Sequence, residues 1–312
     1  MFLEKIKSRE SGVLLYGIAP PKFGNQPERV AEIAQKTIER LSTLDMDALV
    51  VYDVQDESAR TKEERPFPFI NALDPLSFAA SYLSNLPVPK IIYRPAGKFS
   101  TDELSAWLTE LHKQNFYPVF VGIPAPGLPV KTSLPEAYKL WSRNQDTSVI
   151  GAVTIPERHQ VLQDEDARIL DKMNCGVSYF ISQCVFNLDY AKQVIEDLYI
   201  SCNKLVIKPP TIIFTLTACG SDKTLQFMEW LGIHVPNELK EELKTSEDML
   251  EKTVKVCLDI ASALTTFCME RSIPFGFNIE SVAIRKAEIE ASIYLANRIG
   301  QILKDSGLRV VR

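Results

Sequence analysis

The chain has 312 residues, of which 46% are hydrophobic and 24% are charged, and its formal net charge is -5. This is the composition of a globular protein with a large core. The acidic and basic residues are interleaved without a basic block, which argues against a nucleic-acid partner. No apolar run reaches membrane-spanning length, and charges interrupt the N-terminal segment MFLEKIKSRESG too often for a signal peptide. We therefore expect a cytoplasmic protein.

Six cysteines and three histidines are scattered along the chain, and no two cysteines form a CxxC pair. Most of the cysteines lie in apolar segments, where a free thiol behaves as a small hydrophobic side chain. The reducing cytoplasm keeps such thiols unpaired. The sequence therefore predicts reduced cysteines and no metal site.

Short β-rich runs alternate with helical patterns through the first half of the chain. The predicted strands and helices are, in order, Gly12–Ala19 (strand), Glu28–Thr43 (helix), Ala48–Val54 (strand), Asp74–Leu83 (helix), Lys90–Arg94 (strand), a helix that begins at Ser100, Tyr117–Ile123 (strand) and a helix near Pro135–Trp141. The first helix has apolar residues three and four positions apart, as an amphipathic helix requires. Ser100 and Glu103 form a capping-box pattern at the start of the third.

The alternation continues in the second half. The predicted elements are Val149–Ile155 (strand), Gln163–Asn174 (helix), Tyr179–Phe186 (strand), Tyr190–Cys202 (helix), a seventh strand region made of Lys204–Ile207 and Thr211–Thr215, a long helical region over Lys223–Arg271, Pro274–Ile279 (strand) and a final helix Arg285–Lys304. Pro209 and Pro210 interrupt the seventh strand region. Because a double proline cannot lie inside a central strand, one of its two pieces is expected to be a loop.

Eight alternating β/α units predict a parallel sheet. Their spacing and the final helix favour closure, so the predicted fold class is α/β, a (β/α)8 TIM barrel that forms a single domain over residues 1–312. An open doubly wound sheet is the alternative. It would require a Gly-rich first turn, whereas the first strand here ends in GIAPPK instead of GxGxxG.

In barrels of this class the functional groups follow the carboxyl ends of the strands. The polar residues at these ends include Lys22, Asp53, Asp56, Arg94, Thr154, His159, Gln183 and Glu280. The acidic run from Asp53 is either a solvated loop or part of a site. Arg94 needs an acidic partner or a bound anion, since it ends an apolar run. Gln183 lies in an apolar strand, so its amide needs partners in the barrel mouth or in a ligand. His159 is either a loop histidine or a ligand contact.

Five segments resemble the methylenetetrahydrofolate reductases, flavin-dependent barrels that reduce methylenetetrahydrofolate to methyltetrahydrofolate. The segments are YGIAPPK at strand one, GAVTIPERH at strand five, ISQCVFN at strand six, IHVPNEL after strand seven and PFGFNIES at strand eight. They follow the family order and span nearly the whole chain. The resemblance implies a tetrahydrofolate derivative as substrate, NAD(P)H as reductant and FAD as cofactor. It implies no nucleic-acid or membrane partner and leaves a homo-oligomer open.

The resemblance also nominates site residues. Gln183 matches a glutamine that contacts folate, His159 a histidine near the flavin phosphates and Lys172 a lysine that contacts flavin. We add Thr154 as a third cofactor-binding residue because it ends strand five. Arg94 and Asp56, at the ends of strands three and two, join Gln183 as predicted substrate-binding residues.

Several positions depart from the family pattern. The residues that replace the family's functional groups are Gly17 (for the catalytic glutamate), Ile123 (for an aspartate near flavin and folate), Ile155 (for a tyrosine), and Arg168 and Asp171 (for an asparagine and an arginine that contact flavin). A general acid contributes about 10²–10⁴-fold to a rate, and glycine has no proton to give. Asp53 and Glu280 are predicted as substitute catalytic groups.

Three functions remain open from the sequence. The first is a divergent methylenetetrahydrofolate reductase. The second is a folate- or pterin-binding homologue without reductase activity, either a methyl-transfer partner or a regulatory subunit. The third is a barrel enzyme that acts on another anionic substrate through Arg94, Lys22 and the acidic run, because the barrel fold hosts many chemistries.

Overall fold

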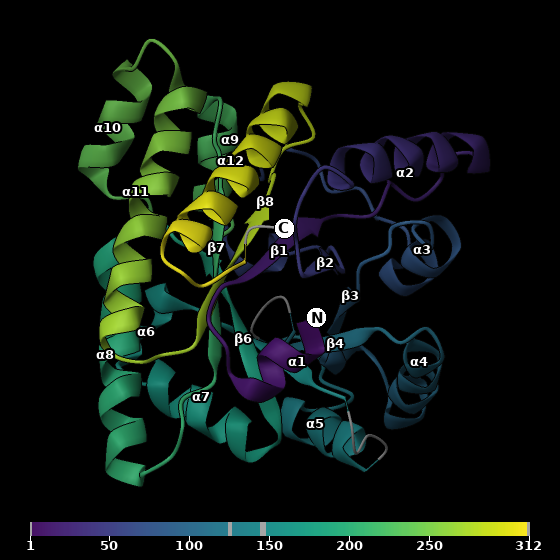
Figure 1. The fold of residues 1–312 in the computed structure, drawn as a ribbon. Helices are drawn as coiled ribbons and strands as arrows, with labels where there is room; N and C mark the ends of the chain where they lie inside the picture. The colour runs from purple at the N-terminus through teal and green to yellow at the C-terminus, as the bar shows by residue number, and fades with distance from the viewer. Residues whose placement is uncertain (1, 124–126, 144–147, 311–312) are drawn as a thin grey trace.

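The computed structural model describes residues 2–123, 127–143 and 148–310. Within these ranges eight parallel strands close into a barrel in sequence order, surrounded by helices (Figure 1). The predicted (β/α)8 fold is therefore confirmed. The strands are β1 (Val13–Ile18), β2 (Ala48–Val51), β3 (Lys90–Pro95), β4 (Tyr117–Val121), β5 (Ile150–Thr154), β6 (Val177–Cys184), β7 (Thr211–Thr217) and β8 (Phe275–Glu280).

Helices follow each strand, and the chain begins with one more. They are α1 (Phe2–Ser8), α2 (Pro27–Leu41), α3 (Pro75–Tyr82), α4 (Thr101–Lys113), α5 (Leu134–Ser142), α6 (Pro156–Leu162), α7 (Glu165–Asn174), α8 (Leu188–Leu205), α9 (Asp222–Trp230), α10 (Asn237–Thr245), α11 (Met249–Glu270) and α12 (Lys286–Asp305). Two 3-10 turns, η1 (Ser58–Arg60) and η2 (Ala96–Lys98), lie in the connections after β2 and β3.

The structure resolves two of the predicted regions in more detail and adds two helices. Lys204 and Leu205 end helix α8, and the chain then passes through the two prolines as a loop, so only the second piece of the seventh strand region is a strand. The region Lys223–Arg271 is not one helical stretch but the three helices α9, α10 and α11. Helices α1 and α6 were not predicted, because each has only seven residues and shows too little periodicity.

Helix α1 closes the end of the barrel at which the strands begin, and Figure 1 shows it in front of the strands. Phe2 is 0% exposed and Ile6 is also buried, in a cluster with the inward-facing residues of the strands. The Phe2 ring lies edge-on to Tyr117 and Tyr179, with centroids 5.3 Å and 5.4 Å away. The apolar side chains of α1 thus fill this end, and the opposite end is left for function.

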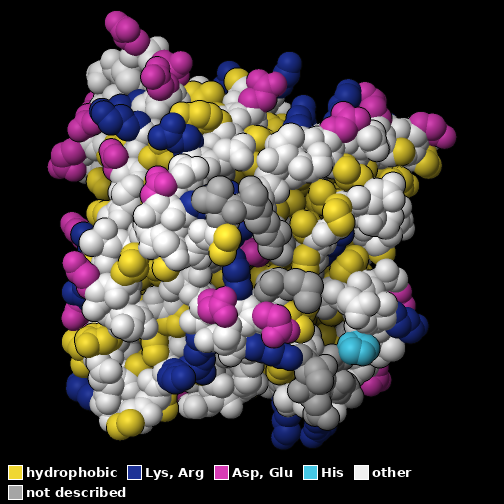
Figure 2. All heavy atoms as spheres, in the orientation of Figure 1, with side chains coloured by type: hydrophobic (Ala, Val, Ile, Leu, Met, Phe, Trp, Pro, Cys, Tyr) yellow, Lys and Arg dark blue, Asp and Glu magenta, His cyan; other side chains and the backbone are white. Residues whose placement is uncertain are grey.

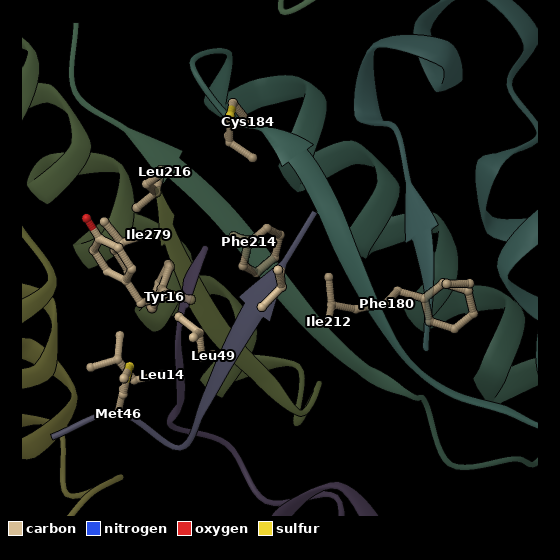
Figure 3. Close-up of a cluster of buried hydrophobic side chains, with 14 of the residues drawn as sticks. Leu14, Tyr16, Met46, Leu49, Phe180, Cys184, Ile212, Phe214, Leu216 and Ile279 are labelled. Atoms are coloured by element: carbon tan, nitrogen blue, oxygen red, sulfur yellow. The ribbon is translucent and has the colours of Figure 1, made fainter. Parts of the chain in front are cut away.

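Side chains of the strands alternate between an inner and an outer layer, as the pleat of a strand requires. Val13, Leu15 and Val50 belong to the inner cluster. Leu14, Tyr16 and Leu49 belong to the cluster between the strands and the helices, part of which is drawn in Figure 3. The Tyr16 hydroxyl lies 2.5 Å from the Ser292 hydroxyl of α12, so the polar end of this buried ring is satisfied.

The surface charges are mixed and the cysteines are unpaired, as the sequence predicts. Lys and Arg side chains are interspersed with Asp and Glu on the face shown in Figure 2. None of the helices in the described ranges combines the length and the apolar character needed to cross a membrane. All six cysteines are free, and all except Cys175 are buried.

The closure by α1 predicts a large cost for truncating Phe2. Phe2→Ala should lower the free energy of unfolding by about 3–5 kcal/mol, because a fully buried phenyl ring leaves a cavity that its neighbours cannot fill. Phe23→Ala is the matched control: Phe23 is 71% exposed, and its truncation should change stability by less than about 0.5 kcal/mol. Urea denaturation followed by circular dichroism measures both, and equal effects would contradict this role of α1.

Candidate functional site

A layer of polar side chains lies inside the carboxyl end of the barrel. Asn278 of β8 is 0% exposed, and its amide donates to the Tyr52 hydroxyl (2.8 Å) and to Thr215 of β7 (3.2 Å). The Asn278 carbonyl oxygen has no partner among the described residues. A buried carbonyl without a donor is costly, so this layer keeps an acceptor for which a ligand or a water can provide the hydrogen bond.

The Tyr52 ring fills the space beside Gly17. A Cβ atom built on Gly17 would lie 2.8 Å from both Cε2 and the hydroxyl oxygen of Tyr52, closer than real Cβ contacts. The ring is held there by Asn278 and by an edge-on contact with Tyr93, with centroids 4.8 Å apart. Sterics therefore explain why position 17 is a glycine, since even a small side chain there would displace the Tyr52 ring.

Glu280 supplies a carboxyl group one strand away from Gly17. The two residues are register partners across β1 and β8. The Cys184 thiol donates to Glu280 Oε1 at 3.2 Å. Burial raises the pKa of Glu280, although hydrogen bonds from Tyr52 and Cys184 act in the opposite direction. A carboxyl group with a raised pKa can hold a proton closer to neutral pH, so the mouth has a candidate general acid at the predicted position.

Glu157 is a second carboxyl group of the mouth, and sequence reasoning gave it no role. It follows β5 at the start of α6, and its Oε2 atom is buried without a partner among the described residues. Burial raises the pKa of Glu157 from 4.5 to about 7. Hydrogen bonds from the backbone N–H groups of Glu157 and His234 lower it, but their effect is smaller. The signal that could have revealed it is its place directly after a strand, in the Ile-Pro-Glu-Arg segment.

Gln183 connects the mouth to the segment between α9 and α10. Its amide nitrogen donates to the Leu231 carbonyl (3.2 Å), and its Oε1 accepts from the Cys184 N–H (3.3 Å). The same segment is held at His234, which lies 3.3 Å from the Asn187 amide and against the Tyr190 ring. Gln183 remains partly exposed, so it both holds this segment and offers an amide edge to a ligand. Its role in substrate binding stays a prediction.

The three predicted cofactor-binding residues do come together, but around a buried glutamate. Glu165 of α7 is 0% exposed and accepts hydrogen bonds from the Thr154 hydroxyl and the Ile155 N–H, both at 3.0 Å. Arg158 adds two contacts, at 2.6 Å and 2.7 Å. This bidentate pairing compensates the buried charge and fixes the β5–α6–α7 connection.

His159 and Lys172 complete this network. His159 is 0% exposed, with Nε2 at 2.8 Å from Asp197 and Nδ1 accepting from the Glu165 N–H at 3.1 Å. Lys172 donates to the Val153 carbonyl at 2.7 Å, and burial lowers its pKa to about 8. The polar atoms of these residues are engaged within the protein, so in this arrangement they do not fit a flavin-binding set. The FAD prediction itself stays untested.

The other predicted residues gather in a cleft outside the strand ring. Arg94 Nη1 lies 2.7 Å from Asp74 and 3.5 Å from Asp53, and its guanidinium covers the Phe99 ring. Of the alternatives for Arg94, the structure shows the internal ion pair. Burial raises the pKa of Asp53 to about 6, with Arg94 acting against the shift. Asp56 also lines this cleft, but its carboxylate accepts hydrogen bonds from the Ser58 N–H (3.0 Å) and hydroxyl (2.6 Å) and caps a local turn.

The two predicted catalytic residues therefore lie in different places. Tyr52 continues β2 with its side chain inward, toward Glu280, so the next residue, Asp53, faces outward. Ile123 also lies away from the inner polar layer: its Cγ2 atom is 2.5 Å from a Cβ built on Gly97, so it packs on the turn η2. Within the described ranges no group of three His, Cys, Asp or Glu residues is arranged to hold a metal ion.

The contact between Gly17 and Tyr52 can be tested with a double-mutant cycle. Gly17→Ala should cost about 1–3 kcal/mol of stability, because the added methyl group overpacks the site. The same change should cost much less when Tyr52 is already replaced by Leu, and the difference is the coupling energy. Gly122→Ala is the control, since its Cβ would meet no atom closer than 3.9 Å. Additive effects in chemical denaturation would show that Tyr52 does not exclude a side chain at position 17.

The raised pKa of Glu157 predicts a pH dependence of stability. The folded state holds this proton up to about pH 7, whereas the unfolded chain releases it near 4.5. Stability contributed by the protonated form is therefore lost as the pH rises between these values, by up to about 1.4 kcal/mol per pH unit. Glu157→Gln should remove that part of the slope in urea melts from pH 4.5 to 7.5. An unchanged slope would indicate an ordinary, solvated carboxylate.

Comparison with known proteins finds a full-length relative of known structure. No protein-family model matches the chain, and no curated protein matches it. An uncharacterized protein from Clostridium thermocellum, which binds two copies of 5-methyl-5,6,7,8-tetrahydrofolic acid, is 45% identical over 97% of this chain and 100% of its own, with a TM-score of 0.86. A 2,3-dimethylmalate lyase is 12% identical over 97% of this chain and 83% of its own, with a TM-score of 0.47, too little to support an argument. The chain therefore belongs to the same family as the Clostridium thermocellum protein.

Proposed function

We propose that the chain binds a reduced folate, 5-methyltetrahydrofolate or a close derivative, in the mouth of its barrel. The observation that carries the proposal is the full-length relative that binds this ligand, at 45% identity. The match covers 97% of this chain and 100% of the relative with a TM-score of 0.86, so the two chains share the barrel fold. The proposal places this function in the cytoplasm, where free thiols such as the six cysteines persist.

The chemistry of the mouth suits a pterin ring, which carries both N–H donors and ring or carbonyl acceptors. Glu157 Oε2 and the Asn278 carbonyl are buried acceptors without partners among the described residues. Gln183 adds an amide that is still partly exposed. Each of these groups gains a hydrogen bond from a polar heterocycle, and unsatisfied buried acceptors reject a ligand that lacks donors.

The anionic-substrate alternative is disfavoured by the same geometry. Arg94 was the cation expected to bind the anion, and its charge is compensated by Asp74 and Asp53. The inner layer adds the carboxyl groups of Glu280 and Glu157, and in the described part of the chain no lysine or arginine forms an ion pair with them. A phosphate or a small dicarboxylate held within this mouth would find no cation to compensate its buried charge among these described residues.

Reduction of a methylene-folate is a second candidate, and one observation favours it. Glu280 lies in register beside Gly17, so a carboxyl group is present one strand away from the position of the family's general acid. In that reaction the acid gives its proton to a folate nitrogen as the ring C–N bond breaks, and hydride from NAD(P)H then reduces the iminium to a methyl group. Oxidation of NAD(P)H that requires methylenetetrahydrofolate separates this candidate from binding alone.

Isothermal titration with 5-methyltetrahydrofolate tests the binding proposal. The wild-type protein should give saturable binding, and Gln183→Ala should weaken binding in the mouth on the order of tenfold, since one or two hydrogen bonds are lost. Gln35→Ala, which removes an exposed glutamine of α2, should leave the affinity unchanged. No heat and no thermal shift with the folate, from a folded wild-type protein, would refute the proposed function.

A further inference from the structure

The cleft outside the strand ring has its own lining and a volume of about 310 Å³. It lies between the β2–α3 connection and the segment that follows β3. Asp53 and Arg94 form its inner part, Phe69 and Phe99 contribute apolar surface, and the exposed Lys98 lies at its edge. It is separate from the inner polar layer, because Tyr52 faces inward and Asp53 faces outward from consecutive positions of the same strand end.

Most charged groups of this cleft already form hydrogen bonds or ion pairs within the protein. Asp74 caps helix α3 through the Ser77 N–H at 2.9 Å and holds Arg94 at 2.7 Å. Asp56 is bound by Ser58. Asp53 differs from both: one of its oxygens accepts from the Gln55 amide, and the other lies 3.5 Å from Arg94, too far for a strong hydrogen bond. Asp53 is therefore a half-buried carboxylate with an oxygen that still lacks a close donor.

The chemistry of this lining selects the class of ligand. Three carboxyl groups, those of Asp53, Asp56 and Asp74, face two cations, Arg94 and Lys98, so the cleft does not attract a phosphate or another anion. A carboxylate beside apolar rings suits a flat, uncharged heterocycle with two neighbouring N–H donors, which a carboxylate binds in a bidentate manner. The volume is at the small end of ligand sites, and it fits a bicyclic ring better than a long molecule.

We propose that this cleft is a second reduced-folate site, which takes the pterin ring of one folate with its 2-amino and N3–H groups on Asp53. The inference rests on the proposed function, and it accounts for a stoichiometry of two like that of the Clostridium thermocellum relative. One folate occupies the barrel mouth near Gln183, and the other occupies the outer cleft. The glutamate tail of the second folate extends past Lys98, whose exposed ammonium group can meet its carboxylates.

Titration of the full-length chain with 5-methyltetrahydrofolate tests the inference through the number of sites. The wild-type protein should bind two molecules per chain. Asp53→Asn should weaken one of the two sites on the order of tenfold to a hundredfold, because the charged acceptor is replaced by a group that also presents N–H donors. Glu64→Gln, in the same β2–α3 connection but outside the lining of the cleft, removes an exposed carboxylate and should keep both sites.

The outcomes separate the inference from the function on which it rests. One molecule per wild-type chain, or two sites that Asp53→Asn leaves intact, overturns the second site and leaves the mouth site standing. Loss of both sites in Gln183→Ala, with Asp53→Asn unaffected, also overturns it, because both copies would then share the mouth. No binding by the wild-type chain refutes the proposed function. Phe69→Ser, checked for folding by thermal melting, provides a second variant that should weaken the outer site and spare the mouth.

Discussion

The Tyr52 ring lies against the backbone of Gly17, and the arrangement of the barrel mouth depends on that contact. The ring occupies the volume in which a side chain at position 17 would point, and its hydroxyl accepts from Asn278 while facing Glu280. Gly17 on β1 and the Glu280 carboxyl group on β8 are thus linked, because the Tyr52 ring contacts both. This arrangement keeps an acidic group in the mouth, displaced by one strand from the reductase position.

The same strand end divides the polar groups into two sites. Tyr52 belongs to the inner layer, and Asp53, the next residue, belongs to the outer cleft with Arg94 and Asp74. The proposed pair of folate sites therefore needs no second domain, because both would lie at one end of the barrel. The network around Glu165 supports the inner site from behind, because it fixes the connection that carries Glu157.

The barrel could be predicted from the sequence because eight strands with turn signals leave few other topologies, and the double proline marked its own loop. The strand-end rule also indicated Glu280, Gln183 and Asp53, whose functional roles stay predictions. The rest depended on three-dimensional contacts. The sequence does not show that Asp53 and Glu280 face opposite sides of the strand ring, or that the polar groups of Thr154, His159 and Lys172 have partners within the protein. Glu157 also follows a strand, but it was given no role, because its burial without a partner for Oε2 can be seen only in the packed structure.

Hydrogen–deuterium exchange with and without 5-methyltetrahydrofolate tests the central claim most directly, because it locates the bound ligand. The account predicts slower exchange in the peptides that contain residues 181–187 and 231–236, which form the mouth, and no change in helix α1 at the closed end of the barrel. A saturated complex with unchanged exchange at the mouth, or with protection confined to the α1 end, would contradict a folate site in this barrel mouth.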